Sequence, residues 1–257
     1  MKRFRFPGGT AVVTGAASGI GAALAAELAS RGMRLVLLDR DAAGLARVHS
    51  GLSDVDVTTH VVDLSDAAAI SAVAQRVPDV RLLVNNAGVA LAGRFDEVTL
   101  EEFDWLIAVN FRAVVHLTHA LLPALKAEPG SHLVTVSSLF GLIAPGGQAA
   151  YSASKFAVRG FTEALRRELT RDAVGVSVVH PGGIRTRIAA NARVGSGVDR
   201  AELVAGLRRI DRLLRMPPER AAQIIARGVE RRNPRILIGA DARLLDLASR
   251  AWPRRVP

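Results

Sequence analysis

The stretch TAVVTGAASGIGAAL, residues 10–24, decides the fold, because it joins a short β-branched run to an alanine-rich helical pattern through a turn with three glycines. Gly15, Gly19 and Gly21 give this turn the spacing G-x-x-x-G-x-G. Glycine allows the backbone angles of a tight turn and leaves room for a ligand. The N-terminus of the following helix attracts phosphate through its free N–H groups and its dipole. The stretch therefore predicts a phosphate-binding strand–turn–helix unit.

Further short apolar runs follow along the chain, separated by stretches with Ala, Leu, Glu and Arg at helical spacing. Strands that alternate with helices form parallel sheets covered on both faces. We therefore expect an α/β fold with a seven-stranded parallel sheet, in one domain over residues 1–257. The expected strands are residues 10–14, 35–39, 59–63, 81–85, 132–138, 175–181 and 235–239.

Composition limits the possible functions. The chain has no cysteine and its six histidines are scattered, so we expect neither disulfides nor a metal site. The net charge of +10 is compatible with anionic partners, but only 4% of residues are aromatic, which argues against binding of nucleic acid. The N-terminus lacks the apolar region of a signal peptide, and no uninterrupted apolar run is long enough to span a bilayer. We expect a cytoplasmic location without membrane insertion.

An acidic residue ends the second expected strand. Asp39 lies 24 positions after Gly15, where a carboxylate accepts hydrogen bonds from the ribose hydroxyls of an adenine dinucleotide. A 2′-phosphate about 4 Å away would be repelled by about 4 kcal/mol at an effective dielectric constant of about 20. Asp39 therefore favours NAD over NADP. Arg40 comes next and can offset this repulsion, so NADP stays open.

Tyr151 is the only tyrosine of the chain, and Lys155 follows it four positions later in AAYSASKFAV, residues 149–158. On a helix these two side chains project from one face. A nearby ammonium group favours the phenolate and so lowers a tyrosine pKa that is normally about 10. Chance pairs of this kind are common, so the pair gains weight only from its surroundings. Ser138 provides such surroundings, because it ends the strand 132–138 at the sheet edge where open α/β folds bind ligands.

Asn110 lies within an otherwise apolar helical run, LIAVNFRAV, residues 106–114. A buried amide needs hydrogen-bond partners, so this residue predicts a capped or kinked helix. Thr99 and Glu102 have the spacing of a capping box that starts the same helix. Residues 185–215 carry eight arginines against three acidic residues, and an insertion of this length after a strand indicates a substrate lid or a packed helical pair.

Five motifs, taken in order, resemble those of the short-chain dehydrogenase/reductase superfamily over nearly the whole chain. They are TGAASGIG at 14–21, DL at 63–64, NNAG at 85–88, YSASK at 151–155 and HPGGIRT at 180–186. The resemblance implies a Rossmann-like three-layer sandwich with the strand order 3-2-1-4-5-6-7. It also implies an NAD(P)-dependent oxidoreductase that interconverts a secondary alcohol and a ketone or aldehyde, assembled as a homodimer or homotetramer.

The resemblance also assigns roles to individual residues. It implies that Tyr151 exchanges a proton with the substrate oxygen, that Ser138 orients this oxygen, and that Lys155 lowers the tyrosine pKa and holds the nicotinamide ribose. Asn110 would hold a water of the proton relay. The implied cofactor contacts are Gly15, Ser18, Gly19, Ile20, Gly21, Asp39, Arg40, Asp63, Leu64, Asn86, Ala87, Gly88, Tyr151, Lys155, Pro181, Gly182, Ile184 and Thr186.

Two other hypotheses belong to different classes. The chain could be a nicotinamide-responsive binding or regulatory protein that has lost turnover, although such a protein needs no proton donor. The basic, amphipathic C-terminus ARLLDLASRAWPRRVP, residues 242–257, resembles a helix at a membrane surface, but packing against another subunit is the commoner use. The apolar residues around 139–143 indicate a small, mainly apolar alcohol or carbonyl substrate.

Overall fold

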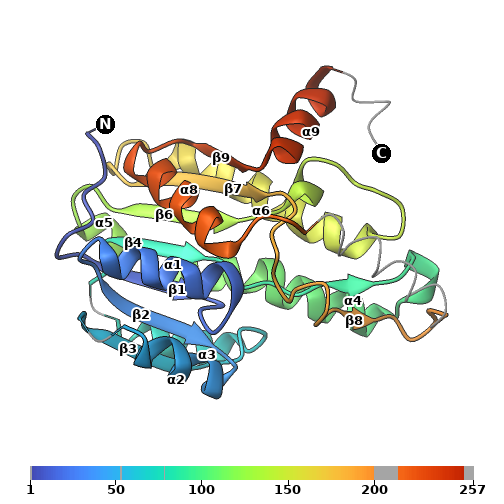
Figure 1. Ribbon diagram of the computed structural model, residues 1–257, viewed down its shortest axis with the longest axis horizontal. Helices are drawn as coiled ribbons and strands as arrows, with labels where there is room; N and C mark the ends of the chain where they lie inside the picture. The colour runs from blue at the N-terminus through green and yellow to red at the C-terminus, as the bar shows by residue number, and fades with distance from the viewer. Residues whose placement is uncertain (1, 53, 78, 200–213, 252–257) are drawn as a thin grey trace.

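A seven-stranded parallel sheet forms the centre of the protein (Figure 1). The computed structural model describes residues 2–52, 54–77, 79–199 and 214–251. The order of the strands is β3-β2-β1-β4-β6-β7-β9, which confirms the expected order 3-2-1-4-5-6-7 when the strands of this sheet are counted along the chain. The strands are β1 Thr10–Thr14, β2 Arg34–Asp39, β3 Val57–Val61, β4 Leu82–Asn85, β6 His132–Val136, β7 Gly175–Pro181 and β9 Arg235–Ile238.

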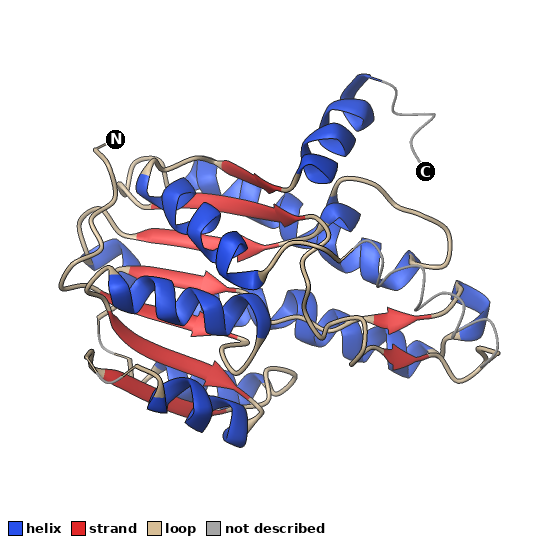
Figure 2. Ribbon diagram, in the orientation of Figure 1, coloured by secondary structure: helices blue, strands red, loops and turns tan. Residues whose placement is uncertain are grey.

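Helices cover both faces of the sheet, which gives the expected three layers (Figure 2). The helices are α1 Gly19–Ser30, α2 Ala42–Ser50, α3 Ala67–Ala74, α4 Leu100–Ile107, α5 Ala113–Ala127, α6 Ala149–Glu168, α8 Pro218–Glu230 and α9 Ala240–Ala251. The core of one face contains α1 and α8, and that of the other contains α3, α5 and α6. Side chains alternate along each strand, so Val13 packs in the first core and Val12 in the second.

The helical unit from Leu100 to Ala127 is continuous but irregular. It begins with the expected capping box of Thr99 and Glu102, and a π-helical segment, η2 Ala108–Arg112, separates α4 from α5. By length and composition this unit is apolar enough to cross a membrane. The sequence analysis did not single it out, because charged residues interrupt its apolar runs. The unit packs in the core against α3 and α6, and we therefore interpret it as a core element.

The third strand begins and ends two residues earlier than expected, at Val57–Val61 instead of 59–63. Its pairing with β2 ends where Asp39 faces Val61, and the chain then turns so that Val62 N donates to Asp39 O. The expected range lay too far along the chain because it counted Val62 as a strand residue. Val62 is apolar and buried, but it follows the strand.

A second, two-stranded parallel sheet joins β5 Leu91–Ala92 to β8 Arg193–Val194. The sequence did not reveal it, since strands of two residues leave no periodic pattern. Short 3-10 helices at η1 Phe95–Glu97 and η3 Leu139–Gly141 complete the described elements. Of the expected lid, residues 200–213 lie outside the described residues, as do residues 252–257 of the basic C-terminus.

Candidate active site

The carboxyl ends of the parallel strands meet at one edge of the sheet, as in other doubly wound folds. This edge brings together the glycine turn after β1, Asp39 at the end of β2, the NNAG segment after β4 and Ser138 after β6. The HPGGIRT segment leaves the same edge at the end of β7. Motifs that are far apart in the sequence therefore border one site.

The glycine turn has a backbone that only glycine adopts without strain. Gly15 and Gly19 have φ angles of +66° and +55°, in the left-handed region that disfavours other residues. Gly21 needs glycine for space, since a Cβ there would lie 2.0 Å from Gly15 O. Ser18 is an exposed N-cap of α1 whose side chain makes no capping bond. The first N–H groups of α1, with Ile20 among them, are therefore open to an anion.

Asp39 is bound to the glycine turn. Its Oδ2 accepts from Ala17 N at 2.9 Å, and its Oδ1 accepts from Asp41 N at 3.0 Å. The expected acid is thus at the expected edge, and it also holds the turn in place. Arg40 is exposed, and its charge contributes to lowering the pKa of Asp63, after the hydrogen bonds from Ser65.

The NNAG segment is held by Thr14, which sequence reasoning did not single out. Thr14 Oγ1 accepts from Asn86 N and Ala87 N, both at 2.9 Å. The Asn86 side chain turns back to the glycine turn, where its Nδ2 donates to Thr14 O at 2.9 Å and to Gly15 O at 3.3 Å. The Asn86 amide therefore joins the NNAG segment to the glycine turn, and its contact with a cofactor stays a prediction.

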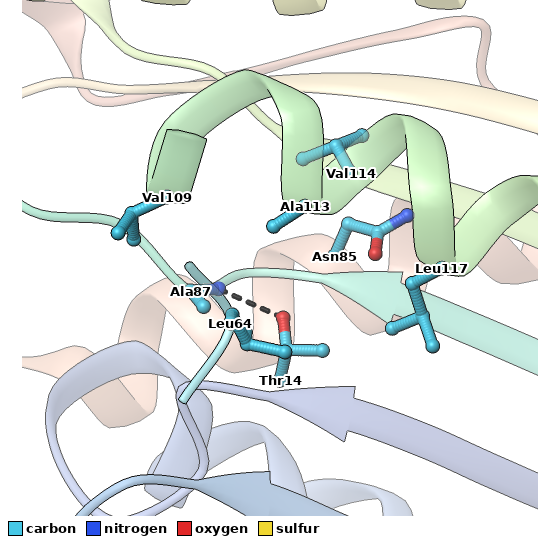
Figure 3. Close-up of a pocket in the computed structure, with 8 residues that line it drawn as sticks. All are labelled: Thr14, Leu64, Asn85, Ala87, Val109, Ala113, Val114 and Leu117. Atoms are coloured by element: carbon cyan, nitrogen blue, oxygen red, sulfur yellow. Dashed lines mark hydrogen bonds between the residues drawn. The ribbon is translucent and has the colours of Figure 1, made fainter. Parts of the chain in front are cut away.

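A small cavity lies behind this segment (Figure 3). Its volume is about 10 Å³, roughly one water molecule, so it has no room for a substrate. Leu64, Ala87 and Val109 line it with other residues of β1, β4 and α5, and the figure shows the bond from Ala87 N to Thr14. Leu64 is buried here, and its contact with a cofactor stays a prediction.

Ser138, Tyr151 and Lys155 come together at the end of β6 and the start of α6. Ser138 lies close enough to Tyr151 for its side chain to act on the pKa of the phenol, and Lys155 Nζ lies 5.7 Å from the centre of the tyrosine ring. Lys155 is buried, and its Nζ donates to Val136 O at 3.2 Å, the single hydrogen-bond partner of this nitrogen among the described residues. A lysine has three donors, so this one has donors left for a ligand. Phe140 stands edge-on to Tyr151 with ring centres 5.9 Å apart.

The tyrosine pKa is shifted in the direction opposite to the expected one. Burial raises the pKa of Tyr151 because it disfavours the phenolate, and the hydrogen bond from Ser138 only partly offsets this. Burial also lowers the pKa of Lys155, to about 8. The expectation that Lys155 lowers the tyrosine pKa was therefore wrong in direction, because burial has the largest effect on this group. Near neutral pH, Tyr151 is a protonated acid beside a mostly charged lysine.

Asn110 occupies the π-helical segment and is fully buried. Its Oδ1 accepts from Val89 N at 2.8 Å, and its Nδ2 donates to Val89 O at 3.0 Å and to Ser154 Oγ at 3.1 Å. Asn110 therefore lies where the regular α-helix is interrupted by a π-helical segment, and its amide joins three segments. One of them is the NNAG segment, since a Cβ at Gly88 would lie 3.3 Å from Asn110 Oδ1 and 3.1 Å from Lys155 Nζ.

Two residues that the sequence analysis did not select hold Ser138 in place. His180, at the end of β7, places its Nδ1 2.9 Å from Ser138 O. Ser137 is buried and donates to Lys155 O at 2.9 Å, which joins β6 to α6. His180 lies within the HPGGIRT motif, but its partner could not be predicted from the sequence, because Ser138 lies 42 positions away.

The remaining part of that motif closes the site on the side of β7. Thr186 approaches the phosphate turn, since its Cγ2 would lie 3.2 Å from a Cβ at Gly19. Ile184 is buried in the core and pairs with Met216. Pro181 is the last residue of β7, and Gly182 N donates to Ile238 O at 2.8 Å.

This geometry defines a dinucleotide-binding α/β protein with a proton donor at the edge of its sheet. The glycine turn and the N-terminus of α1 fit a pyrophosphate, Asp39 fits a ribose diol, and the free donors of Lys155 fit a second ribose. The described residues contain no cluster of His, Cys, Asp and Glu that fits a metal ion.

Comparison with known proteins gives the family. Residues 9–196 match the family model of short chain dehydrogenases. SadH from Mycobacterium tuberculosis, named as an oxidoreductase, is 42% identical over 254 aligned residues, which span 95% of this chain and 91% of SadH. A dehydrogenase/reductase SDR family protein 7-like of Drosophila melanogaster is 32% identical over 92% of this chain and 74% of its own length. The chain therefore belongs to the short chain dehydrogenase family.

Solved structures agree with this assignment. A short chain dehydrogenase/reductase from Burkholderia phymatum, in complex with NAD, has a TM-score of 0.87 and 31% identity over 99% of this chain and 98% of that one. A short chain dehydrogenase from Burkholderia cenocepacia, in complex with NADP, has a TM-score of 0.80 and 30% identity over 93% of this chain and 99% of that one. The two nicotinamide cofactors thus occur on the same fold at similar identity.

Proposed function

We propose that this protein is an NAD(P)-dependent oxidoreductase that interconverts a secondary alcohol and a ketone or aldehyde. The observation that carries the proposal is the only tyrosine of the chain, which lies beside Ser138 and 5.7 Å from the ammonium of the buried Lys155 at the carboxyl edge of the sheet. Relatives that are named as oxidoreductases and similar structures in complex with NAD or NADP support it.

In the proposed reaction, the residues of the chain bind the substrate oxygen and move one proton. A bound nicotinamide dinucleotide supplies or accepts the hydride. Tyr151 gives its proton to the oxygen of the reduced substrate, and Ser138 donates a hydrogen bond that orients this oxygen. The ammonium of Lys155 stabilises the phenolate left on Tyr151. Asn110 keeps the NNAG segment and α6 at a fixed distance from these groups.

For the cofactor we favour NAD over NADP. Asp39 presents a carboxylate at the end of β2 that would repel a 2′-phosphate, and its hydrogen bonds to backbone N–H groups hold it in place. Arg40 is exposed and free to turn toward such a phosphate. Side-by-side fluorescence titration with NADH and NADPH decides between them. Tighter binding of NADH supports the proposal, and binding of neither cofactor would overturn the proposed function.

The test of the chemistry is Tyr151→Phe, which removes one hydroxyl and almost no volume. We expect turnover of the best substrate from a panel of alcohols and ketones to fall by about a thousandfold or more, because the proton donor is lost. The Kd for NADH should change by less than about threefold. Phe140→Leu, which alters the neighbouring ring but no proton, is the matched control. Near-normal turnover of Tyr151→Phe would contradict the mechanism.

One observation favours the alternative, a regulatory protein that binds a nicotinamide cofactor without turnover. Burial raises the pKa of Tyr151, which makes the phenolate that alcohol oxidation needs less accessible. Cofactor binding without turnover over the whole panel, in both directions, would favour this alternative.

The surroundings of the site support a small and mainly apolar substrate. Phe140 packs edge-on against Tyr151, and Leu142 is buried. An open groove of about 470 Å³ lies beside α6, lined by residues 144–147 and by Ala149, Ser152, Ala153 and Phe156. Because this groove is apolar and Phe156 is 39% exposed, we propose that this face of α6 joins subunits in a homodimer or homotetramer. We place the protein in the cytoplasm.

A further inference from the structure

The C-terminal helix α9 is joined to the HPGGIRT segment by one carboxylate. Figure 1 shows α9 leaving the edge of the sheet next to β9. Asp241, in the first turn of α9, accepts from Gly183 N through Oδ2 at 2.8 Å and from Ala242 N through Oδ1 at 2.9 Å. The bond to Gly183 crosses 58 positions of sequence. It is therefore a tertiary contact, while the bond to Ala242 is local.

The segment fits this carboxylate closely. A Cβ at Gly182 would lie 2.2 Å from Asp241 Oδ1 and 2.3 Å from Asp241 Oδ2. Glycine at this position thus leaves the space in which the carboxylate reaches Gly183 N. At the turn into α9, Gly239 has a φ of +100°, and a Cβ there would lie 2.1 Å from Asp241 Oδ1. The backbone on both sides of Asp241 is shaped around this side chain.

The segment held in this way lies between the two halves of the proposed site. It starts at Pro181, on the strand next to β6 that leads to Ser138. It ends at Thr186, which contacts the phosphate turn at Gly19. Asp39, at the adenosine end of the proposed site, lies on β2, and β1, β4 and β6 separate β2 from β7 in the sheet. The segment therefore borders the reactive end of a dinucleotide and not its adenosine end.

We propose that Asp241 is a positioning residue, which holds the segment from Pro181 to Thr186 in the position that receives the nicotinamide half of the cofactor. The inference rests on the proposed function, because it assumes that the site binds a nicotinamide dinucleotide. Asp241 acts through Gly183 N and touches no reacting atom.

Helix α9 has other anchors, so the loss of Asp241 leaves the helix in place. Ala242 is fully buried, and Asp246 is paired with Arg235, which also binds Glu163 of α6 at 2.8 Å. An effect of Asp241 on the segment can therefore be separated from an effect on the attachment of α9.

The test compares two ligands that differ only in the nicotinamide half. Asp241→Ala is titrated with NADH and with ADP-ribose, which has the same adenosine diphosphate but no nicotinamide. We expect the Kd for NADH to rise about three- to tenfold, as for the loss of one charge-assisted hydrogen bond at a partly exposed site. The Kd for ADP-ribose should change by less than about twofold. Asp241→Asn keeps one acceptor oxygen and should recover part of the NADH affinity.

Glu219→Ala is the matched control, because Glu219 is also an exposed acid in the first turn of a helix, α8, and among the described residues it makes no side-chain hydrogen bond or ion pair with the segment. It should change neither Kd. Equal losses for NADH and ADP-ribose in Asp241→Ala, or no loss for either, would overturn the inference while the proposed function stands. If the wild-type protein bound neither ligand, the proposed function would fail together with the inference.

Gly182→Ala supplies a second variant that keeps Asp241. The added Cβ would displace the end of a flexible side chain, so it should weaken NADH binding by a similar factor with little loss of stability. If this effect passes through the carboxylate, the double variant with Asp241→Ala binds NADH no more weakly than Asp241→Ala alone. A fully additive loss would mean that the Cβ obstructs the ligand directly and would count against the role of Asp241.

Discussion

At the residue scale, Asp39 shows how one side chain serves structure and specificity together. Both of its oxygens accept backbone N–H groups, so the carboxylate is already ordered before a ribose arrives. The sequence indicated its position at the end of a strand, because the motif is local. It did not indicate the bond to Ala17, because that contact depends on how β1 and β2 lie side by side.

The first prediction concerns this residue. Asp39→Ala should change the ratio of the Kd values for NADPH and NADH by about tenfold or more in favour of NADPH, because the repulsion of a 2′-phosphate is lost. Asp41→Ala is the control: it removes the neighbouring acid that caps α2 and should cost about 1 kcal/mol of stability without a change in this ratio. An unchanged ratio in Asp39→Ala would mean that Arg40 or another residue sets the preference.

A second prediction follows from the pKa of Lys155, about 8. The kcat/KM for carbonyl reduction should fall as the pH rises through about 8, because a neutral lysine no longer stabilises the phenolate that Tyr151 leaves after proton transfer. The raised pKa of Tyr151 keeps its proton in place over this range. Lys155→Arg, whose charge persists, should lose this limb of the pH profile even if its rate is lower. A wild-type profile that stays flat to about pH 9.5 would contradict the assignment.

At the element scale, the unit Leu100–Ala127 carries its irregular segment where the site needs it. The apolar spacing and the capping box could be read from the sequence, and Asn110 indicated a kink. The partners of Asn110 could not be predicted, because Val89 and Ser154 belong to two other segments. The two-residue strands β5 and β8 were missed for the related reason that their pairing is entirely tertiary.

Asn110→Leu gives the prediction at this scale. A leucine fills a similar volume but removes the side-chain partner of Val89 N and O and one of the two partners of the Ser154 hydroxyl, so we expect a loss of about 2–4 kcal/mol in the free energy of unfolding. The kcat should fall by a larger factor than the KM changes, because Gly88 lies against both this amide and Lys155. Thr118→Val is the control: it breaks one buried bond, to Asn85 Nδ2, in the same helical unit. It should lower stability by about 1–2 kcal/mol and leave turnover intact. Equal effects of the two variants on turnover would remove the special role of Asn110.

At the scale of the whole molecule, two buried histidines link the stability of the fold to pH. His132 at the start of β6 and His180 at the end of β7 are fully buried. Burial lowers the pKa of His132 to about 3, with a smaller effect of Arg232, and lowers that of His180 to about 4. Each has one ring nitrogen without a partner among the described residues. Both histidines are therefore neutral in the folded protein at neutral pH.

The sign of the pH effect follows from these shifts. Between about pH 6.5 and pH 4 the unfolded chain binds protons at both histidines and the folded protein does not, so stability falls as the pH falls. With about 1.4 kcal/mol per pH unit for each group, the free energy of unfolding should be about 4 kcal/mol lower at about pH 5 than at about pH 7. Urea unfolding at the two pH values measures this difference.

His180→Asn, which keeps a donor for Ser138 O, should reduce this difference by about half. His116→Gln, which changes an exposed histidine on α5, should leave it unchanged. Equal stability of the wild-type protein at the two pH values would show that the buried rings do not control it.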